Sequence, residues 1–400
     1  MSKQERCIGQ SERKESEPKT RLGYLGPVGT YTKMAANMYV GNNPEKFILV
    51  ECETIDEAMI AASKGLIDEA VVPIENSSAG PVKNTHIGFE ELDAIRITGE
   101  VVLPINHTLY MRWDAVPEAV VSKDQAIAQC EMNIKGLLPD ARLIEENSTA
   151  KAVQMAAEDP KIAAIGSPIA ARDLGLENVL QRIDNFSDDP RNATTFVVIK
   201  KNPELSDQTE NDKTTFIIEL EDQPGGLYDF LYLLNQKGIN LNKIKSLRKT
   251  DGHISFLVSI DKHQKDQKVG VALSELSEKT LRIKMLGSYQ KANYTPSVES
   301  REPNMENAIK RIKAEVQNGE LADDNQAVVV FTLQNKPGAL LNALKPFQEE
   351  GINLTKIDSQ ASGIFEEYIF YLAYDKRSVQ NEEKLRKILT QNCHELVILK

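Results

Sequence analysis

The sequence has few of the features that mark secreted, metal-binding or membrane proteins. Its four cysteines, Cys7, Cys52, Cys130 and Cys393, lie far apart and form no CxxC or Cys/His cluster. That spacing argues against a disulfide framework and a zinc site, and is typical of reduced thiols. The N-terminus lacks an apolar core, and no run of about 18 apolar residues occurs, so neither a signal peptide nor a membrane span is predicted. We therefore expect a cytoplasmic protein.

Basic residues are also in the minority. The chain has 48 Lys and Arg against 59 Asp and Glu, which gives a net charge of −11 and a pI near 5.2. Nucleic acids and anionic membranes attract basic patches, and none stands out in the sequence, so neither is expected as a partner. An anionic ligand would therefore have to be bound by a local arrangement of donor groups, and not by a broad basic surface.

Patterning divides the 400 residues into several units. Residues 1–20 are polar and predict a disordered tail. Over 21–200, short apolar runs alternate with helix-like stretches, which is typical of an α/β domain with largely parallel strands. The apolar runs are 47–50, 69–74, 163–167 and 196–199, and the helix-like stretches are 32–40, 56–64 and 149–158.

The second half of the chain contains a repeat. DQPGGLYDFLYLLNQKGINLNKIKS at 222–246 returns as NKPGALLNALKPFQEEGINLTKIDS at 335–359, a shift of 113 residues. Each copy predicts the βαββαβ order of a ferredoxin-like sandwich. The predicted units are the copies at 212–290 and 326–400 and, between them, a polar linker at 291–325 with a helix near 303–318.

The Pro-Gly turn of each copy exposes backbone N–H groups at a helix N-terminus, which suits a small carboxylate such as an amino acid. The alternative is that Gly225 and Gly338 only permit the turn. The repeated unit resembles the ACT domain, a regulatory module that binds its ligands at this loop and the following strand. The resemblance implies effector contacts at Gly225, Gly226, Leu227 and Ser246 in the first copy, and at Gly338, Ala339, Leu340 and Ser359 in the second.

Several stretches between residues 22 and 199 are rich in hydroxyls, amides and glycine, at the ends of predicted strands. In LGYLGPVGTYTKMAA (22–36), Gly29 and Thr30 open a helix whose N-terminus can hold an anion, although a tight turn with an N-cap is the alternative. The spacing matches neither a P-loop nor GxGxxG. The other stretches are VVPIENSSAGPV (71–82), VVSKDQAIAQC (120–130), EENSTAKAVQMA (146–156) and DDPRNATTFVVI (188–199).

In this order the motifs resemble prephenate dehydratase: GPxGT, PIENS, GEVVLPINHTL (99–109), S..Q…QC, an STA helix, and NATTF in place of NxTRF, ahead of an ACT domain. The resemblance covers about residues 21–290, and the second copy is an addition. It implies two α/β lobes around a cleft, similar to the type 2 periplasmic binding fold. It also implies conversion of prephenate to phenylpyruvate, water and carbon dioxide, with no metal and no organic cofactor.

The resemblance also implies site residues. The family's catalytic threonine aligns with Thr194, and its amide contacts align with Asn76 and Gln125. Substrate contacts are implied at Gly29, Thr30, Ser77, Ser148, Thr149 and Thr195.

The sequence departs from the family pattern at two motifs. Thr195 replaces the arginine of TRF, with Arg191 as a possible substitute, and SKDQ replaces SHPQ, which brings Lys123 near the predicted cleft. His107 could be a general acid, but a hydrogen-bonded structural histidine is the favoured interpretation.

Other functions stay open at this point. The enzymatic alternatives are prephenate decarboxylation and arogenate as the substrate, and the non-enzymatic one is an amino-acid sensor with a decayed cleft. Phenylalanine or another amino acid is the expected effector, and a homodimer or homotetramer formed through the ACT sheets is the expected assembly.

Overall fold

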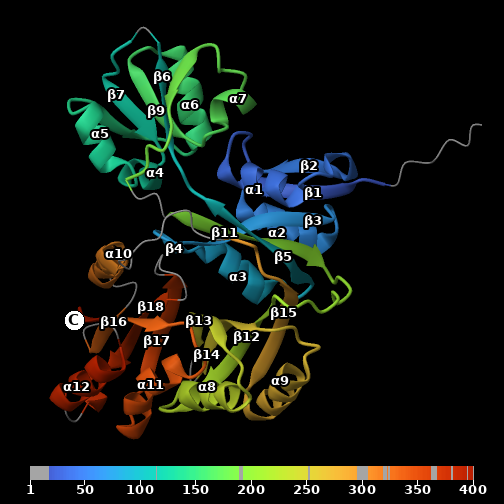
Figure 1. Ribbon diagram of the computed structural model, residues 1–400, viewed down its shortest axis with the longest axis vertical. Helices are drawn as coiled ribbons and strands as arrows, with labels where there is room; N and C mark the ends of the chain where they lie inside the picture. The colour runs from blue at the N-terminus through green and yellow to red at the C-terminus, as the bar shows by residue number, and fades with distance from the viewer. Residues whose placement is uncertain are drawn as a thin grey trace, which may run out of the picture.

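The computed structural model shows three bodies arranged along the long axis of the molecule (Figure 1). The upper two are the lobes of an α/β unit, and the lowest is built from the two repeats. No helix in the described part of the chain is long and apolar enough to cross a membrane. Arg191 and residues 1–17 of the predicted tail lie outside the described residues, which are 18–113, 115–188, 192–250, 253–294, 305–318, 322, 325–361, 367–379, 382–393 and 395–399.

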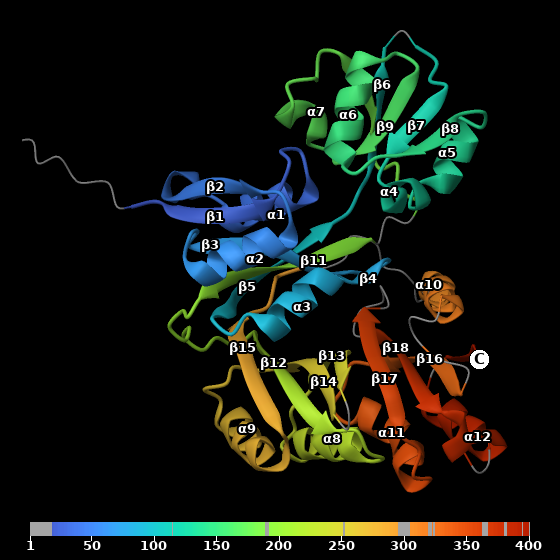
Figure 2. The ribbon, with the colours of Figure 1, turned by 180° about the vertical axis from the view of Figure 1, so that it is seen from behind.

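The first lobe is a mixed sheet with helices on both faces (Figure 2). Its described strands pair in the order β2-β1-β3-β11-β5, and β4 pairs with β3. Strands β1, β2 and β3 are parallel as predicted, whereas β11 is antiparallel to β3 and β5, because the chain returns through β11 from the second lobe. The elements are β1 Thr20–Leu25, α1 Tyr31–Val40, β2 Phe47–Cys52, α2 Ile55–Lys64, β3 Glu69–Asn76, β4 Gly80–Pro81, α3 Lys83–Glu91, β5 Ile95–Pro104 and β11 Ala193–Lys201.

Local sequence signals set the ends of these elements, as α2 illustrates. The side chain of Thr54 caps the helix by accepting a hydrogen bond from the backbone N–H of Glu57 (3.0 Å). The helix ends at Gly65, whose φ of +77° is a left-handed conformation that favours glycine. Between these ends, Ala58 and Met59 are fully buried against the sheet.

The second lobe is a smaller sheet of the same kind. Its described strands pair in the order β10-β6-β9-β7-β8, with β7 parallel to β8 and β9. Helix α6 packs through Val153 on one face, and α4 and α5 pack through Ile127 and Ile134 on the other. The elements are β6 Thr108–Arg112, β7 Ala119–Ser122, α4 Asp124–Ala128, α5 Glu131–Leu137, β8 Arg142–Glu145, α6 Thr149–Glu158, β9 Ile162–Gly166, α7 Ala170–Asp173 and β10 Leu180–Ile183.

Two chain segments cross between the lobes side by side. One leads from β5 to β6, and the other leads from β10 to β11. The backbone N–H of Ile105 in the first crossing donates to the carbonyl of Asn192 in the second (2.7 Å), and that of Phe186 donates to the carbonyl of His107 (2.7 Å). The two α/β lobes match the fold class expected from the resemblance.

The two repeats form one continuous sheet. Each shows the predicted order βαββαβ, and the described strands pair as β15-β12-β14-β13-β17-β18-β16-β19. Strand β13 pairs antiparallel with β17, with Lys245 opposite Asp358. This pairing joins the sheets of the two repeats within one chain. The elements are β12 Asp212–Glu221, α8 Gly226–Gln236, β13 Leu241–Thr250, β14 His253–Asp261, α9 Gln267–Lys279 and β15 Arg282–Gln290, then β16 Gln326–Gln334, α11 Ala339–Glu349, β17 Leu354–Ala361, β18 Glu367–Asp375, α12 Glu382–Asn392 and β19 Leu396–Ile398.

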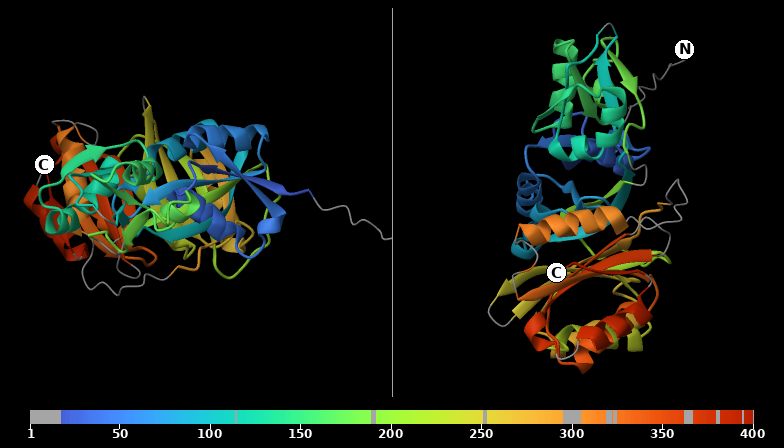
Figure 3. Two further views of the ribbon diagram at one scale, coloured as in Figure 1. Left: turned by 90° about the horizontal axis from the view of Figure 1, so that it is seen from above. Right: turned by 90° about the vertical axis from the view of Figure 1, so that its left-hand side faces the viewer.

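Both faces of this long sheet are covered. Helices α8, α9, α11 and α12 lie on one face, and the first lobe and helix α10, Met305–Gln317, lie on the other (Figure 3). Leu257 and Leu286 of the first repeat share a core cluster with Ile97 of the first lobe. Helix α10, predicted as part of a linker, packs Ile312 against Val328 of the second repeat. The linker helix thus shields apolar sheet surface from water.

Candidate active site

Three of the motif stretches meet at one edge of the first-lobe sheet. Because β1 and β3 are parallel, the loops that follow Leu25 and Asn76 leave the sheet at the same end. Strand β11 runs the opposite way and begins at this end, where Thr194 pairs with Asn76 and Ala193 pairs with Pro104. The GPVGT, PIENS and NATTF stretches are therefore brought together beside the crossing segments.

The side chains of Asn76 and Thr194 are in direct contact. Asn76 Nδ2 donates to Thr194 Oγ1 at 2.9 Å, and both residues are buried. The backbone N–H groups of Ser78 and Ala79 donate to Asn76 Oδ1 at 3.0 and 2.7 Å. These two bonds fix which way the carboxamide points, so the amide hydrogens face Thr194.

Asn192 is a site residue that the sequence reasoning missed. Its Oδ1 accepts the second hydrogen bond from Asn76 Nδ2 (2.8 Å), and its side chain is 2% exposed. Its Nδ2 has no partner among the described residues. Ser77 lies beside Asn192, and its Oγ accepts a hydrogen bond from the backbone N–H of Ala193 (3.0 Å). The sequence signal that could have identified Asn192 is its position as the first residue of the NATTF motif.

Thr195 does not join this cluster. It pairs with Glu75, and because side chains alternate along a strand, its hydroxyl lies on the face opposite to that of Thr194. On that face Glu75 Oε2 binds Lys243 Nζ of the first repeat at 2.6 Å. The predicted substrate contact at Thr195 is therefore not supported, since only one of the adjacent hydroxyls can face Asn76.

Gly29 and Thr30 lie at the start of α1, where Gly29 contacts the second lobe. Gly29 has φ +83° and accepts a hydrogen bond from Ser167 Oγ of the second lobe at 2.6 Å. Thr30 caps α1 by accepting from the backbone N–H of Lys33 (3.3 Å), and its hydroxyl donates to the carbonyl of Leu25 (3.0 Å). The Thr30 hydroxyl thus has a structural role as an N-cap, the alternative considered from the sequence.

The second-lobe residues follow two parallel strands. Gln125 comes after β7, and Ser148 and Thr149 come after β8, so all three lie beyond the same sheet edge. Gln125 is exposed on α4. Ser148 precedes α6, but its Oγ makes no capping bond and is buried without a partner in the described structure. Simple capping therefore does not explain the buried hydroxyl of Ser148.

His107 is a structural residue of the first crossing segment. Its Nδ1 lies 2.9 Å from the Tyr31 hydroxyl, and its Nε2 lies 2.8 Å from Gln129 Oε1. Burial lowers the pKa of the imidazole, although the bond to Gln129 raises it. A buried ring with both nitrogens engaged matches the favoured structural interpretation.

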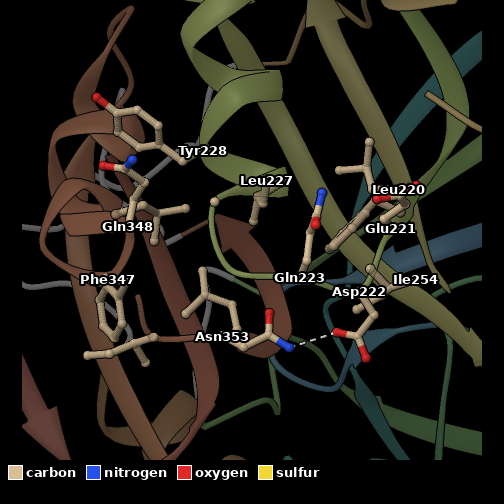
Figure 4. Close-up of a pocket in the computed structure, with 15 residues that line it drawn as sticks. Leu220, Glu221, Asp222, Gln223, Leu227, Tyr228, Ile254, Phe347, Gln348 and Asn353 are labelled. Carbon is tan, nitrogen blue, oxygen red and sulfur yellow. Dashed lines mark hydrogen bonds between the residues drawn. The ribbon is translucent and has the colours of Figure 1, made fainter. Parts of the chain in front are cut away.

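Each repeat contributes a Pro-Gly turn to a pocket shared with the other repeat. Gly225 and Leu227 line the first pocket together with Phe347 and Gln348 of α11 (Figure 4). At the rim of this pocket, Asn353 Nδ2 donates to Asp222 Oδ1 at 2.9 Å. The second pocket mirrors the first and is lined by Gly338, Ala339 and Leu340 with Leu231, Leu234 and Asn235 of α8.

Three predicted effector contacts lie elsewhere. Gly226 lines a neighbouring cavity between α8 and α9. Ser246 Oγ donates to the carbonyl of Ile357 (3.0 Å), and the backbone N–H of Ile244 donates to Ser359 Oγ (3.0 Å). The structure does not support the predicted ligand contacts at Ser246 and Ser359, because both hydroxyls are buried in the pairing of β13 with β17.

Comparisons with known proteins identify the family of this chain. A family model described as prephenate dehydratase matches residues 22–204. A bifunctional chorismate mutase/prephenate dehydratase of Aquifex aeolicus (strain VF5) is 38% identical over 280 residues, covering 69% of this chain and 75% of that protein. A prephenate dehydratase of Bacillus subtilis (strain 168) is 31% identical, covering 68% of this chain and 98% of that protein. A solved prephenate dehydratase from Arthrobacter aurescens, in complex with L-Phe, has 30% identity and a TM-score of 0.63, covering 75% of this chain and 99% of that one. Through these relatives, the chain belongs to the prephenate dehydratase family.

Proposed function

We propose that this protein converts prephenate to phenylpyruvate, water and carbon dioxide, and that the Thr194 hydroxyl assists departure of the ring hydroxyl. The observation that supports this role is the buried contact between Asn76 Nδ2 and Thr194 Oγ1, at 2.9 Å. Because the Thr194 oxygen accepts from the amide, its own hydrogen remains to donate to a substrate oxygen. The donor is oriented before the substrate arrives.

The reaction needs little more from the protein than such a donor. Loss of the hydroxyl and of carbon dioxide makes the ring aromatic, so much of the driving force lies in the substrate. A hydrogen bond to the departing oxygen strengthens as negative charge develops there, and it therefore lowers the barrier rather than only improving binding. One such donor typically contributes about 3 kcal/mol, or roughly a hundredfold in rate. A carboxylate in its place would repel a substrate with two carboxylates.

Asn192 and Ser148 are further candidates for substrate contacts. Asn192 Nδ2 and Ser148 Oγ are buried, and neither has a partner within the described ranges. An unsatisfied buried polar group costs free energy, and a bound ligand or water removes that cost. We assign Asn192 Nδ2 as a donor to a prephenate carboxylate, while Gln125 keeps its proposed amide contact.

We also propose that amino acids regulate the protein at the two pockets between the repeats, each repeat being an ACT domain. The first and second pockets have volumes of about 20 and 30 Å³. That space holds one or two water molecules, so an amino acid the size of phenylalanine requires α8 and α11 to move apart. In the first pocket, the Asp222 carboxylate can bind the ammonium group of an amino acid. Asn335 occupies the equivalent position in the second pocket.

Turnover of prephenate by the purified protein tests the proposed reaction. Formation of phenylpyruvate is followed by its absorbance in alkali, with Thr194→Ala and Thr194→Ser as variants. We expect about a hundredfold loss of kcat in Thr194→Ala and substantial recovery in Thr194→Ser, which restores the hydroxyl. Full activity in Thr194→Ala would exclude the proposed role of this residue. A folded parent protein that binds amino acids without consuming prephenate would favour the sensor.

A further inference from the structure

An ion pair between the first repeat and the first lobe involves the residue that precedes Asn76. Lys243 Nζ of β13 binds Glu75 Oε2 of β3 at 2.6 Å, and the two side chains are 14% and 16% exposed. The other carboxylate oxygen, Glu75 Oε1, is buried with no partner among the described residues. Lys243 therefore compensates the charge of a carboxylate that is largely removed from water.

The strand that carries Glu75 also carries the amide of the candidate site. Because side chains alternate along a strand, Glu75 points toward the first repeat, whereas Asn76 points toward Thr194 and donates to its Oγ1 at 2.9 Å. The register of β3 with β11 shifts between Thr195 and Phe196, which separates this strand end from the rest of the ladder by a β-bulge. An interrupted ladder constrains the strand end less, so a contact from outside the sheet matters more.

Thr195 occupies the position from which the first lobe itself could supply the cation. It lies directly opposite Glu75 in the pairing of β11 with β3. Residues opposite each other in an antiparallel pair have Cβ atoms about 5 Å apart, on the same face of the sheet. The family motif TRF has arginine here, whereas Thr195 carries no charge. Lys243 thus provides, from the first repeat, the positive charge that an arginine at position 195 would provide from the neighbouring strand.

We propose that Lys243 is a positioning residue: by holding Glu75, it keeps Asn76 oriented toward Thr194, so that the first repeat completes the active site of the first lobe. Without Lys243, a largely buried carboxylate has no cation, and it gains free energy by moving toward water. Movement of Glu75 carries the adjacent Asn76 amide away from Thr194. The effect on turnover rests on the proposed function, but the effect on the orientation of Asn76 does not.

A second ion pair between the same two bodies provides a matched control. Lys213 Nζ of β12 binds Glu100 Oε2 of β5, and these side chains are 18% and 7% exposed. Glu100 lies opposite Val197, whereas the end of β5 at the candidate site is Pro104, opposite Ala193. Loss of Lys213 therefore weakens the contact between repeat and lobe without acting on the strand end that carries Asn76. Comparing the two lysines separates positioning from general loss of interface stability.

Hydrogen exchange of the full chain tests the positioning role without substrate. The backbone N–H groups of Ser78 and Ala79 donate to Asn76 Oδ1 at 3.0 and 2.7 Å, so their exchange reports how firmly this side chain is held. Lys243→Met should speed exchange of these two amides several fold, and Lys213→Met should not. Unchanged exchange in Lys243→Met would overturn the proposal. An equal increase in both variants would do so too, because it would reflect interface stability alone.

Moving the charge into the first lobe tests the same role in turnover of prephenate. Lys243→Met should lower kcat about tenfold and change KM less, because the misplaced donor acts in the transition state. Lys243→Arg and Lys213→Met should stay near the parent kcat. Thr195→Arg in the Lys243→Met background places a guanidinium opposite Glu75, and should restore most of kcat and slow amide exchange again. A double variant as impaired as Lys243→Met would contradict the proposal.

Glu75→Gln removes the ion pair from its other side and keeps the test informative if Lys243→Met fails to fold. It should also speed exchange of the Ser78 and Ala79 amides, and unchanged exchange in this variant would overturn the proposal. A parent protein that does not consume prephenate would exclude the proposed function instead. The exchange measurements would still decide whether Lys243 positions Asn76, so the two failures are distinguishable.

Discussion

Lys245 and Asp358 occupy the same position in the two repeats, and they face each other across the paired strands. Lys245 Nζ lies 3.0 Å from Asp358 Oδ2, and the side chains are 12% and 3% exposed. If two first repeats paired in this way, lysine would face lysine, and two second repeats would place aspartate opposite aspartate. The charges therefore favour pairing of a first repeat with a second repeat over pairing of two like repeats.

The ion pair between Lys245 and Asp358 is expected to stabilise the paired sheet. Asp358→Asn should lower the free energy of unfolding by about 3 kcal/mol, because it leaves a nearly buried lysine without its carboxylate. Lys245→Met in the same background should restore part of that loss, and thermal or urea unfolding of all three variants measures the coupling. The exposed pair of Lys135 and Glu131 is the control, and Lys135→Met should cost less than about 0.5 kcal/mol. Equal effects of Asp358→Asn and Lys135→Met would contradict the expectation.

We expect activity to depend on the hydrogen-bond donor of the Asn76 side chain, rather than only on the size and polarity of that side chain. Asn76→Asp keeps an acceptor for the backbone N–H groups of Ser78 and Ala79 but removes the donor to Thr194. It also places negative charge beside a substrate with two carboxylates. We expect kcat to fall by about a hundredfold or more with the fold retained, as measured by prephenate turnover and circular dichroism.

Gln125→Glu is the matched isosteric change in the second lobe. A comparable loss of activity would support the proposed amide contact at Gln125, although this residue is exposed in the structure. Activity at the parent level in this variant would remove Gln125 from the site.

His86 should make the protein sensitive to acid. It is 2% exposed on α3, and burial lowers the pKa of its imidazole well below the ordinary value, with Lys243 and Lys245 lowering it further. The unfolded chain therefore takes up a proton at a higher pH than the folded chain does. Stability from this group is present above the ordinary histidine pKa near 6.5 and is lost as the pH falls, by up to about 1.4 kcal/mol per pH unit.

His86→Leu should flatten this part of the pH dependence. The measurement compares the unfolding midpoints of the parent protein and the variant between about pH 7.5 and pH 5. This range spans the ordinary histidine pKa of about 6.5. Parallel pH curves for the two proteins would show that His86 does not titrate on unfolding.

Gly287 should be indispensable for contact between the first repeat and the first lobe. Its φ is +142°, and a Cβ there would come within 2.2 Å of the carbonyl oxygen of Ile97. Both groups belong to the backbone, so Gly287→Ala should cost about 2 kcal/mol or more. Gly270→Ala is the control, since a Cβ there makes only ordinary contact on helix α9, and it should stabilise the helix by about 0.5–1 kcal/mol. Equal melting temperatures for both variants would refute the expected clash.

The sequence alone predicted several helices and strands of the two lobes and the order of elements in each repeat. Apolar periodicity and turn residues predicted the helices at 32–40, 56–64 and 149–158, which the structure places at Tyr31–Val40, Ile55–Lys64 and Thr149–Glu158. These signals are local, because a helix face or a strand end is read from neighbouring residues. The two repeated copies predicted two βαββαβ units, because the strand, turn and helix signals within each copy are local as well.

Tertiary structure decided which distant residues meet. Strand register placed Thr194, and not Thr195, against Asn76, and pairing of β13 with β17 took Ser246 and Ser359 out of the predicted pockets. Proximity between distant residues depends on strand register and packing, which no local pattern contains.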